Sequence, residues 1–329
     1  MLLDNFYINV PWTSQTVFEV NATSSNFAFV TNSSGIGTGT HYWGYLNPGK
    51  TTVIDWGDGT NVEYWPTRYP PQHIYRSPGN YTVSIEDTLD YVSFYRDSKL
   101  SSDGLTKLVR LGDSIKTCSY LMYGRTDLAE VPENFDNSNE ISSMYYAFYG
   151  CKGLRTPFAK WPANCHNTQY CFQNSGIVIP PEDFNHISCT ANMVYTFTSC
   201  SNLLYPEDDW PDVIVQSLAY MYDGCTSLTR LPATWPEASK GAYNYSFMFR
   251  NCKNISTRLK KWPEFKSGTS PNVSQMYSYC LKLAGVWDDS APDSELMPSS
   301  ITSHSNTFTG ASAAVRSKFL TTWGGTRSS

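Results

Sequence analysis

The amino-acid sequence predicts an N-terminal all-β sandwich followed by an α/β solenoid of about eight units. Short segments of alternating apolar and polar residues, separated by Gly, Pro, Asn and Ser, fill residues 16–90. Downstream, one motif recurs every 24–31 residues, which is typical of a solenoid. The expected division is residues 1–90 for the sandwich, 91–115 for a connecting strand and N-terminal cap, 116–311 for the repeats and 312–329 for a C-terminal cap or tail.

The composition is that of an ordered chain with little net charge. Its 329 residues are enough to bury a sizeable core. The 24 Lys and Arg against 29 Asp and Glu give a net charge of -5, which argues against nucleic acid or an anionic membrane as partner. No apolar run is long enough to span a membrane. The N-terminus has no basic segment before an apolar one, so we expect no signal peptide.

The first 90 residues contain the strand-like segments TVFEV, FAFV, TTVIDW and YTVSI. Their alternation predicts half-buried β-strands, and the intervening Gly, Pro and Asn predict turns. Within them, IDWGDGT (residues 54–60) and HIYRSPGNYTVSI (residues 73–85) resemble the paired motifs of the PKD-type immunoglobulin-like fold. The resemblance implies a β-sandwich for this part of the chain.

Asp55 and Asp58 in the first of these motifs are candidates for a calcium site. Two carboxylates are too few for the six to eight oxygens that Ca²⁺ prefers. An Asp beside Gly in a tight turn usually bonds its own backbone instead. We therefore expect no metal at this turn.

The downstream repeat is centred on one position, which we call the anchor. The anchor is Cys151, Cys200, Cys225, Cys252 and Cys280 in five copies, and Arg125, Ser175 and Ala311 in the other three. Other positions are counted from the anchor, so that position −3 of the second copy is Phe148. A unit of this length cannot bury its apolar side alone, and stacking of the copies is expected.

The pattern within one unit predicts its local structure. Apolar side chains recur at positions −7, −4 and −3, for example Met144, Ala147 and Phe148. Residues three and four apart share one helical face, so these positions predict a short helical turn. A Leu or similar residue at position +3 opens a segment that we expect to pair in a narrow parallel sheet. A Trp–Pro step at position +10, as at Trp161, is expected to return the chain to the next coil.

The cysteines are expected to be reduced and buried, because Cys behaves as a small apolar residue and the anchor also accepts Arg, Ser and Ala. One cluster has residue types that suit zinc: Cys165, His166, Cys171, His186 and Cys189. Cys171 falls at position −4, a core position, and the spacing matches no common ligand pattern. We therefore expect no metal there.

The run aromatic-x-x-Cys-x-x-Leu followed by Pro resembles the BspA-type leucine-rich repeats of bacterial surface proteins and some bacteriophage proteins. The resemblance covers about residues 116–311, and it departs from the family in the Trp–Pro steps and the additional Tyr. The resemblance implies a leucine-rich-repeat solenoid. It also implies the observed order, in which a PKD-like domain comes before the repeats.

Position −5 is aromatic in six successive copies. It holds Tyr120, Tyr146, Tyr170, Tyr195 and Tyr220, followed by Phe247. On a helical turn this position points away from the apolar face, which predicts an exposed aromatic ladder that binds sugar rings or a partner protein. The alternative is that the rings stack on one another and seal the outer side of the solenoid, which is the usual reason for a repeated solenoid position.

No arrangement of residues indicates catalysis. There is no G-x-S-x-G motif, and the five His are scattered. An acidic turn contains Glu207, Asp208, Asp209 and Asp212, and we expect it to be a solvated loop. The sequence thus predicts a protein without enzymatic activity and without a cofactor.

We expect a structural and recognition protein of a bacteriophage virion, such as a capsid decoration or fibre protein. Its expected partners are other virion proteins, or a surface glycan or protein, and homo-oligomers within an assembly; nucleic acid and membrane insertion are not expected. Reduced cysteines agree with assembly in a cytoplasm. The alternative is a bacterial cell-surface adhesin that binds host protein or glycan.

Overall fold

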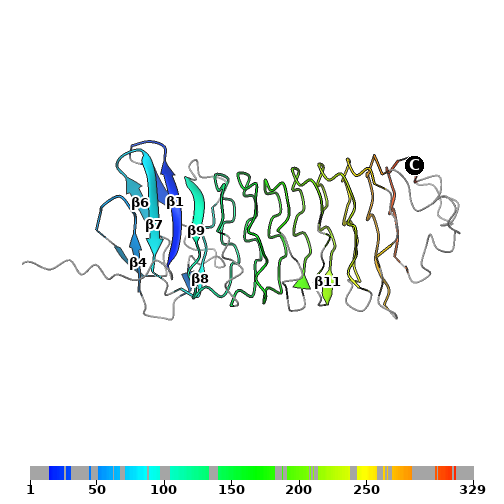
Figure 1. Ribbon diagram of the computed structural model, residues 1–329, viewed down its shortest axis with the longest axis horizontal. Helices are drawn as coiled ribbons and strands as arrows, with labels where there is room; N and C mark the ends of the chain where they lie inside the picture. The colour runs from blue at the N-terminus through cyan, green and yellow to red at the C-terminus, as the bar shows by residue number, and fades with distance from the viewer. Residues whose placement is uncertain are drawn as a thin grey trace, which may run out of the picture.

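A computed structural model describes the greater part of the chain. The described residues are 15–25, 27–30, 44–45, 51–61, 63–66, 71–86, 89–96, 104–132, 140–181, 187, 191–206, 208, 210, 214–237, 243–257, 262–263, 265, 269–283, 301, 303–312 and 315. Figure 1 shows strands gathered at one end of an elongated molecule, followed by a row of similar coils.

The N-terminal part consists of short antiparallel strands (Figure 1). They are β1 (Thr16–Ala22), β2 (Phe27–Val30), β3 (Gly44–Tyr45), β4 (Thr51–Asp55), β5 (Glu63–Pro66), β6 (Gln72–Tyr75), β7 (Gly79–Ile85), β8 (Tyr91–Val92) and β9 (Leu105–Arg110). Five of them form one sheet in the order β5-β4-β7-β1-β9, while β2 pairs with β6 and β3 pairs with β8. Strands β8 and β9 therefore pair with strands from the first 90 residues.

Aromatic side chains fill the space between these strands. The ring of Phe18 on β1 lies 5.8 Å from the ring of Phe29 on β2, measured between centroids, and 4.8 Å from the ring of Phe94. All three are buried. Because Phe94 lies in the segment that leads toward the coils, the N-terminal core continues into the rest of the molecule.

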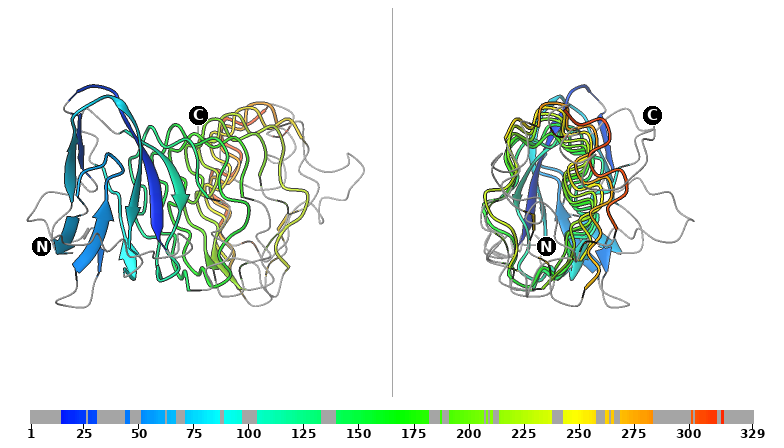
Figure 2. Two further views of the ribbon diagram at one scale, coloured as in Figure 1. Left: turned by 60° about the vertical axis from the view of Figure 1, so that its left-hand side comes forward. Right: turned by 90° about the vertical axis from the view of Figure 1, so that its right-hand side faces the viewer.

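The coils are held together by a regular backbone ladder. The N–H groups at positions −7, −5, −3 and −1 donate to carbonyl oxygens of the next coil, as from Met144 to Asn167 at 2.8 Å and from Gly150 to Gln173 at 2.9 Å. The N–H groups between them donate within their own coil, as from Ala147 to Met144 at 3.0 Å. Seen down the stack, the coils nearly superimpose (Figure 2, right).

The predicted fold class, a sandwich followed by an α/β leucine-rich-repeat solenoid, was wrong: no helical element lies within the described residues. The backbone angle φ explains the difference. Position −5 has a positive φ in all eight copies, at Tyr120, Tyr146, Tyr170, Tyr195, Tyr220, Phe247, Gln275 and Asn306. Position −1 does as well, at Gly124, Gly150, Asn174, Ser199, Gly224, Asn251, Tyr279 and Gly310. A residue in the left-handed region interrupts a right-handed helix. Each coil therefore consists of successive turns, and the apolar side chains of these turns point inward.

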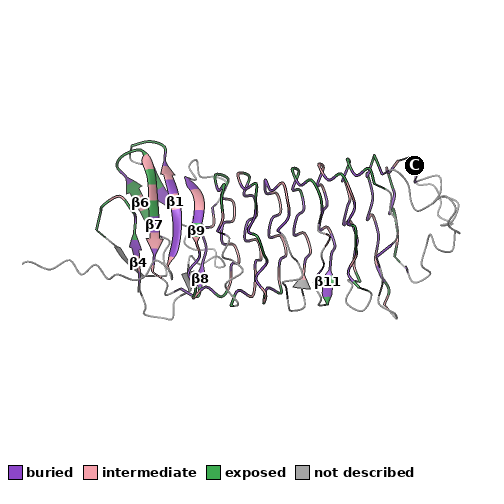
Figure 3. Cartoon of the chain, viewed as in Figure 1, coloured by how far each residue is buried: buried purple, intermediate pink, exposed green. Residues whose placement is uncertain are grey.

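In the described residues, the segments that begin at position +3 do not form the expected strands, although single backbone hydrogen bonds join them between coils, as from the N–H of Leu204 to the carbonyl oxygen of Val178 at 3.0 Å. Parallel pairing occurs instead at position −8, where β10 (Ala191–Asn192) pairs with β11 (Val215–Ser217). Isolated parallel bridges join Ser143 to Asn167 and Asn244 to Asn272 in the same column. Buried residues follow one another along every coil in Figure 3, so the core runs through the length of the stack.

Arg125 joins the N-terminal strands to the first coil. Its Nε atom donates to the carbonyl oxygen of Phe94 at 2.6 Å, and its guanidinium lies 5.4 Å from the centroid of the Phe29 ring. The side chain is almost fully buried. Arg125 thus joins the aromatic core of the N-terminal strands to the first coil.

Candidate functional site

Two columns of aromatic rings run through the stack. The inner column, at position −3, is buried, and its neighbouring rings are nearly parallel with centroids 5.4–5.8 Å apart. It contains Phe148, Phe172, Phe197, Tyr222, Phe249, Tyr277 and Phe308. The outer column, at position −5, contains the five tyrosines that the sequence singled out, followed by Phe247. Its neighbouring rings are 4.3–5.3 Å apart with interplanar angles of 5–14°.

The outer column is half-buried, and its rings are stacked face to face. Tyr146, Tyr170, Tyr195 and Tyr220 each have aromatic neighbours on both faces. A sugar ring has no free face on which to stack at these four residues. What they offer to a partner is the ring edge and the hydroxyl group.

Four tyrosines of this column, Tyr120, Tyr146, Tyr170 and Tyr195, have pKa values raised above that of a free tyrosine. Burial is the main cause, together with neighbouring tyrosines, and it raises the pKa of Tyr195 to about 12. The pKa values of Tyr120, Tyr146 and Tyr170 are raised for the same main reason. Their hydroxyl groups can therefore donate hydrogen bonds.

Further tyrosines, at positions where Tyr does not recur throughout the chain, surround the first half of this column. Tyr95, Tyr123 and Tyr149 form a second stack with centroid spacings of 4.6 and 4.5 Å. Tyr145, at position −6, lies edge-on to Tyr146 at 4.6 Å. These positions are Tyr in only one or two of the coils, so the repeat pattern did not reveal them.

A polar column at position −8 runs beside the tyrosines. Its residues are Thr117, Ser143, Asn167, Asn192, Ser217, Asn244, Asn272 and Ser303. In the first seven of them a side-chain oxygen accepts a hydrogen bond from the backbone N–H two residues later, at 2.9–3.3 Å. Asn, Ser and Thr are the residues that form such local turns, which explains the composition of the column.

We use the name tyrosine face for positions −8, −6, −5 and −2 of the first four coils. It consists of Thr117, Ser119, Tyr120, Tyr123, Ser143, Tyr145, Tyr146, Tyr149, Asn167, Gln169, Tyr170, Gln173, Asn192, Val194, Tyr195 and Thr198. Ring contacts join positions −6, −5 and −2, and a 3.0 Å hydrogen bond joins the hydroxyls of Ser119 and Ser143. None of these residues is charged, and all are half-buried except Thr198, which is buried.

Charge returns where the tyrosine face ends. Arg250 makes two hydrogen bonds to the carboxylate of Asp223, at 3.0 and 2.6 Å. Its guanidinium also lies 5.4 Å from the ring centroid of Tyr220 and 4.8 Å from that of Phe247. The protein thus covers the last two rings of the outer column with its own cation.

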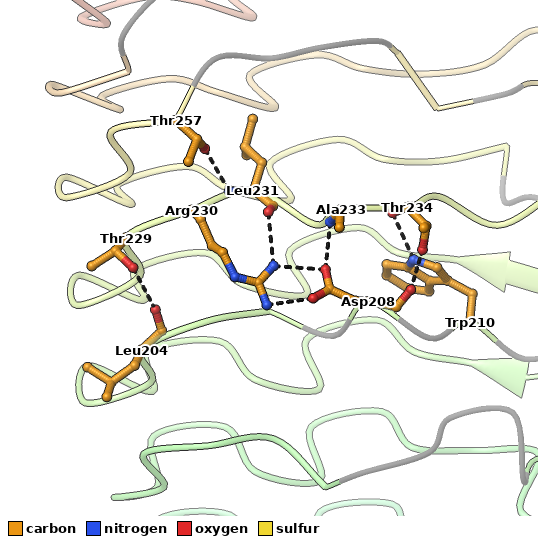
Figure 4. Close-up of polar contacts among 9 residues, drawn as sticks. All are labelled: Leu204, Asp208, Trp210, Thr229, Arg230, Leu231, Ala233, Thr234 and Thr257. Atoms are coloured by element: carbon orange, nitrogen blue, oxygen red, sulfur yellow. Dashed lines mark hydrogen bonds and ion pairs between the residues drawn. The ribbon is translucent and has the colours of Figure 1, made fainter.

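The acidic turn that was expected to be a solvated loop contains a structural ion pair (Figure 4). Asp208 accepts two hydrogen bonds from Arg230, at 2.8 and 2.5 Å, and one from the N–H of Ala233 at 2.6 Å. Burial alone would raise the pKa of Asp208, but these hydrogen bonds outweigh it and lower the pKa. The expectation was wrong for Asp208; Glu207, Asp209 and Asp212 lie outside the described residues.

The carboxylates of the N-terminal turn bind their own chain. Asp55 accepts the N–H of Gly57 at 2.9 Å, and Asp58 accepts the N–H of Thr60 at 3.0 Å. Asp58 also lies 2.8 Å from Nε2 of His73. Burial would raise the pKa of Asp58, but its bonds to Thr60 and His73 lower it. Both carboxylates are thus used to shape the turn, as the sequence predicted.

No group of three or more His, Cys, Asp or Glu among the described residues could hold a metal ion. In the cluster whose residue types suit zinc, Cys165 and Cys171 are buried and His166 is exposed. His186 and Cys189 lie outside the described residues. All eight described cysteines are buried and unpaired by disulfides.

Within the described residues, no helix has the length and apolar character needed to cross a lipid bilayer.

Comparisons with known proteins identify a family for the repeats. No match to a curated protein or to a solved structure was found. One family model matches three overlapping segments, residues 112–210, 142–262 and 174–288, which together span more than half of the chain. The chain belongs to the family described as Mycoplasma protein of unknown function, DUF285.

Proposed function

We propose that this protein is a non-enzymatic structural and recognition protein of a bacteriophage virion, either a capsid decoration or a fibre component. The observation that carries the proposal is the tyrosine face: an uncharged, half-buried surface that is displayed on a backbone-bonded stack of coils. Such a surface is rigid before it meets a partner, and a rigid surface loses little conformational entropy on binding.

The use of the ionisable groups supports a scaffold rather than an enzyme. Asp58, Asp208 and Asp223 each bind a neighbouring side chain of the same chain, and each contributes to holding a turn or joining two coils. A general acid or base has to face a substrate instead. These carboxylates face their own chain.

The virion location is supported by the buried, unpaired thiols, because virion proteins fold in the reducing cytoplasm of the host. The similarity of the repeats to BspA-type proteins also fits a surface-recognition role. A second candidate, a bacterial cell-surface adhesin for host protein or glycan, is favoured by the family description, which names a cellular bacterium.

The test is quantitative mass spectrometry of purified native particles and of washed cells from the source, with light scattering of the purified full-length chain. A fixed copy number per particle, resistant to salt washing, is the expected result. Recovery of the protein only on the surface of uninfected cells would overturn the virion proposal and support the adhesin. Detection of the protein neither in the particles nor on the washed cells would reject both the virion proposal and the adhesin.

A further inference from the structure

We propose that the tyrosine face binds an uncharged linear polysaccharide, which runs along the stack from coil to coil. This inference deepens the proposed recognition function and rests on it. Three properties of the face carry the argument: its lack of charge, its repetition, and the arrangement of its rings.

The first property is the lack of charge across four coils. The 16 residues include seven Tyr and no Asp, Glu, Lys or Arg, although 16% of the whole chain is charged. A charged partner group buried against this face would lose water and gain no opposite charge, which is unfavourable. Most protein surfaces carry many charges. An uncharged polysaccharide carries none and avoids this cost.

The second property is repetition. Parallel hydrogen-bonded chains lie about 4.8 Å apart, and the ring spacing of 4.4–5.3 Å along Tyr120, Tyr146, Tyr170 and Tyr195 agrees with this. Each coil presents an Asn, Ser or Thr at position −8 and a tyrosine edge at position −5. A polymer of identical sugar units is a ligand that repeats along its length in the same way, so several weak contacts can add up.

The third property is the arrangement of the rings. The outer column offers hydroxyls and ring edges, which suit the hydroxyl groups of sugars. Tyr149 offers more, because its only stacked neighbour among the described residues is Tyr123, and the next residue of that column is Gln173. The next coil thus places an amide side chain, rather than another ring, beside Tyr149, so that amide and the Tyr149 hydroxyl together offer hydrogen-bonding groups that suit a sugar. Tyr145 lies edge-on to Tyr146 at 4.6 Å and is not part of either stack.

The experiment uses affinity electrophoresis of the full-length protein in native gels that contain one polymer each. The neutral polymers are dextran, mannan, laminarin, soluble starch and xylan, and the anionic ones are alginate and heparin. We expect at least one neutral polymer to retard the protein in proportion to its concentration, and neither anionic polymer to do so. Retardation by no neutral polymer, or by the anionic ones alone, would overturn the proposal.

The variant Y145S/Y149S tests the surface without removing a ring from the outer column. It is expected to weaken binding of the retarding polymer at least tenfold in Kd while the variant still unfolds in one cooperative urea transition, at a somewhat lower midpoint because the Tyr123–Tyr149 stacking is lost. The matched control is Tyr205→Ser, which removes a 37% exposed tyrosine outside the tyrosine face and should bind as the parent does. Equal binding by Y145S/Y149S and the parent would overturn the proposal.

A failure of this inference can be told apart from a failure of the proposed function. A protein that is present at fixed copy number in particles and ignores every neutral polymer would keep its structural role and lose the polysaccharide. Specific capture of a protein partner that Y145S/Y149S abolishes, without polymer binding, would assign the face to a protein instead and reject the present proposal.

Discussion

The Sγ atom of Cys200 lies 2.9 Å from the carbonyl oxygen of Phe172, one coil earlier in the stack. The same contact, at 3.0–3.1 Å, is made by Cys151, Cys225, Cys252 and Cys280. The carbonyl of Phe172 also accepts the N–H of Ser175 in its own coil, so the thiol occupies its second lone pair. The anchor therefore favours a residue that is small and apolar yet able to donate a weak hydrogen bond, and Cys combines these properties.

Replacement of one anchor tests this account. Cys225→Ser keeps a donor of similar size, and Ser occurs naturally at anchor 175. Cys225→Ala removes the donor and leaves a small void. We expect Cys225→Ala to lower the free energy of unfolding by about 1–2 kcal/mol, and Cys225→Ser to cost less. The midpoint of urea unfolding of the full-length chain measures both, and an equal loss for Ser and Ala would refute the hydrogen-bond explanation.

The buried thiols also predict a loss of stability in alkali. Burial raises the pKa of Cys200 to about 11 and that of Cys280 to about 12. In the unfolded chain thiols ionise near about 8.5, so above that pH the unfolded state binds fewer protons than the folded state. The contribution of these groups is complete below about pH 8.5 and is lost as the pH rises toward about 12. The urea midpoint should fall steadily between pH 8 and about 10.5; a midpoint that stays level or rises would contradict this.

Much of the stack could be predicted from the sequence, because the period and the inward positions −7, −4 and −3 depend only on apolar patterning. The local structure of each coil could not be predicted, because the same apolar pattern is satisfied both by a helical turn and by turns with left-handed residues. Gly124, Gly150, Gly224 and Gly310 at position −1 were the available signal, since Gly favours a positive φ. At position −5 only Asn306 gives such a hint, because bulky Tyr rarely adopts that conformation.

The same limit applies to the tyrosine face. The repeat pattern selected position −5, where Tyr recurs in five successive coils. Tyr145 and Tyr149 contact Tyr146 within their own coil. The register of the stack also places Tyr145 against Tyr120 and Tyr170, and Tyr149 against Tyr123. Residues that do not recur become visible as a surface only when the register of the stack is known.

The left-handed backbone at position −5 predicts an unusual order of substitutions. Tyr195 has a φ of 61° and stacks between Tyr170 and Tyr220. Tyr195→Asn and Tyr195→Val both remove the stacked ring, but Asn tolerates this conformation and β-branched Val does not. We expect Tyr195→Val to be the less stable variant by about 1–2 kcal/mol in urea unfolding. Equal stability, or a more stable Val variant, would show that the strain at this position is unimportant.

The ion pair between Asp208 and Arg230 is expected to stabilise the return side of the stack. Asp208→Asn keeps the shape and removes the charge, and we expect a loss of about 1 kcal/mol after allowing for the partial exposure of both side chains. Since the folded-state pKa of Asp208 is lowered, its contribution is present above its unfolded pKa of about 3.9 and is lost as the pH falls below it. The difference between parent and variant should therefore shrink at about pH 3.

The matched control is Glu130→Gln. Glu130 pairs with Lys107, but its side chain is 63% exposed, so water screens the pair and the substitution should not measurably change the urea midpoint. A loss as large as that of Asp208→Asn would mean that charge removal in general, and not the hydrogen-bonded geometry of Asp208, lowers stability.

The final prediction separates backbone strain from steric conflict in the N-terminal turn. Gly57 and Gly59 have similar φ angles, 75° and 80°. A Cβ atom on Gly57 would lie 2.2 Å from the carbonyl oxygen of Thr82 on β7, whereas a Cβ on Gly59 would meet nothing within 4 Å. Gly59→Ala should cost about 1 kcal/mol, which is the cost of the left-handed conformation alone. Gly57→Ala should cost at least roughly 2 kcal/mol more, because β7 has to move. If urea unfolding gave the two variants the same stability, the close packing of this turn against β7 would be disproved.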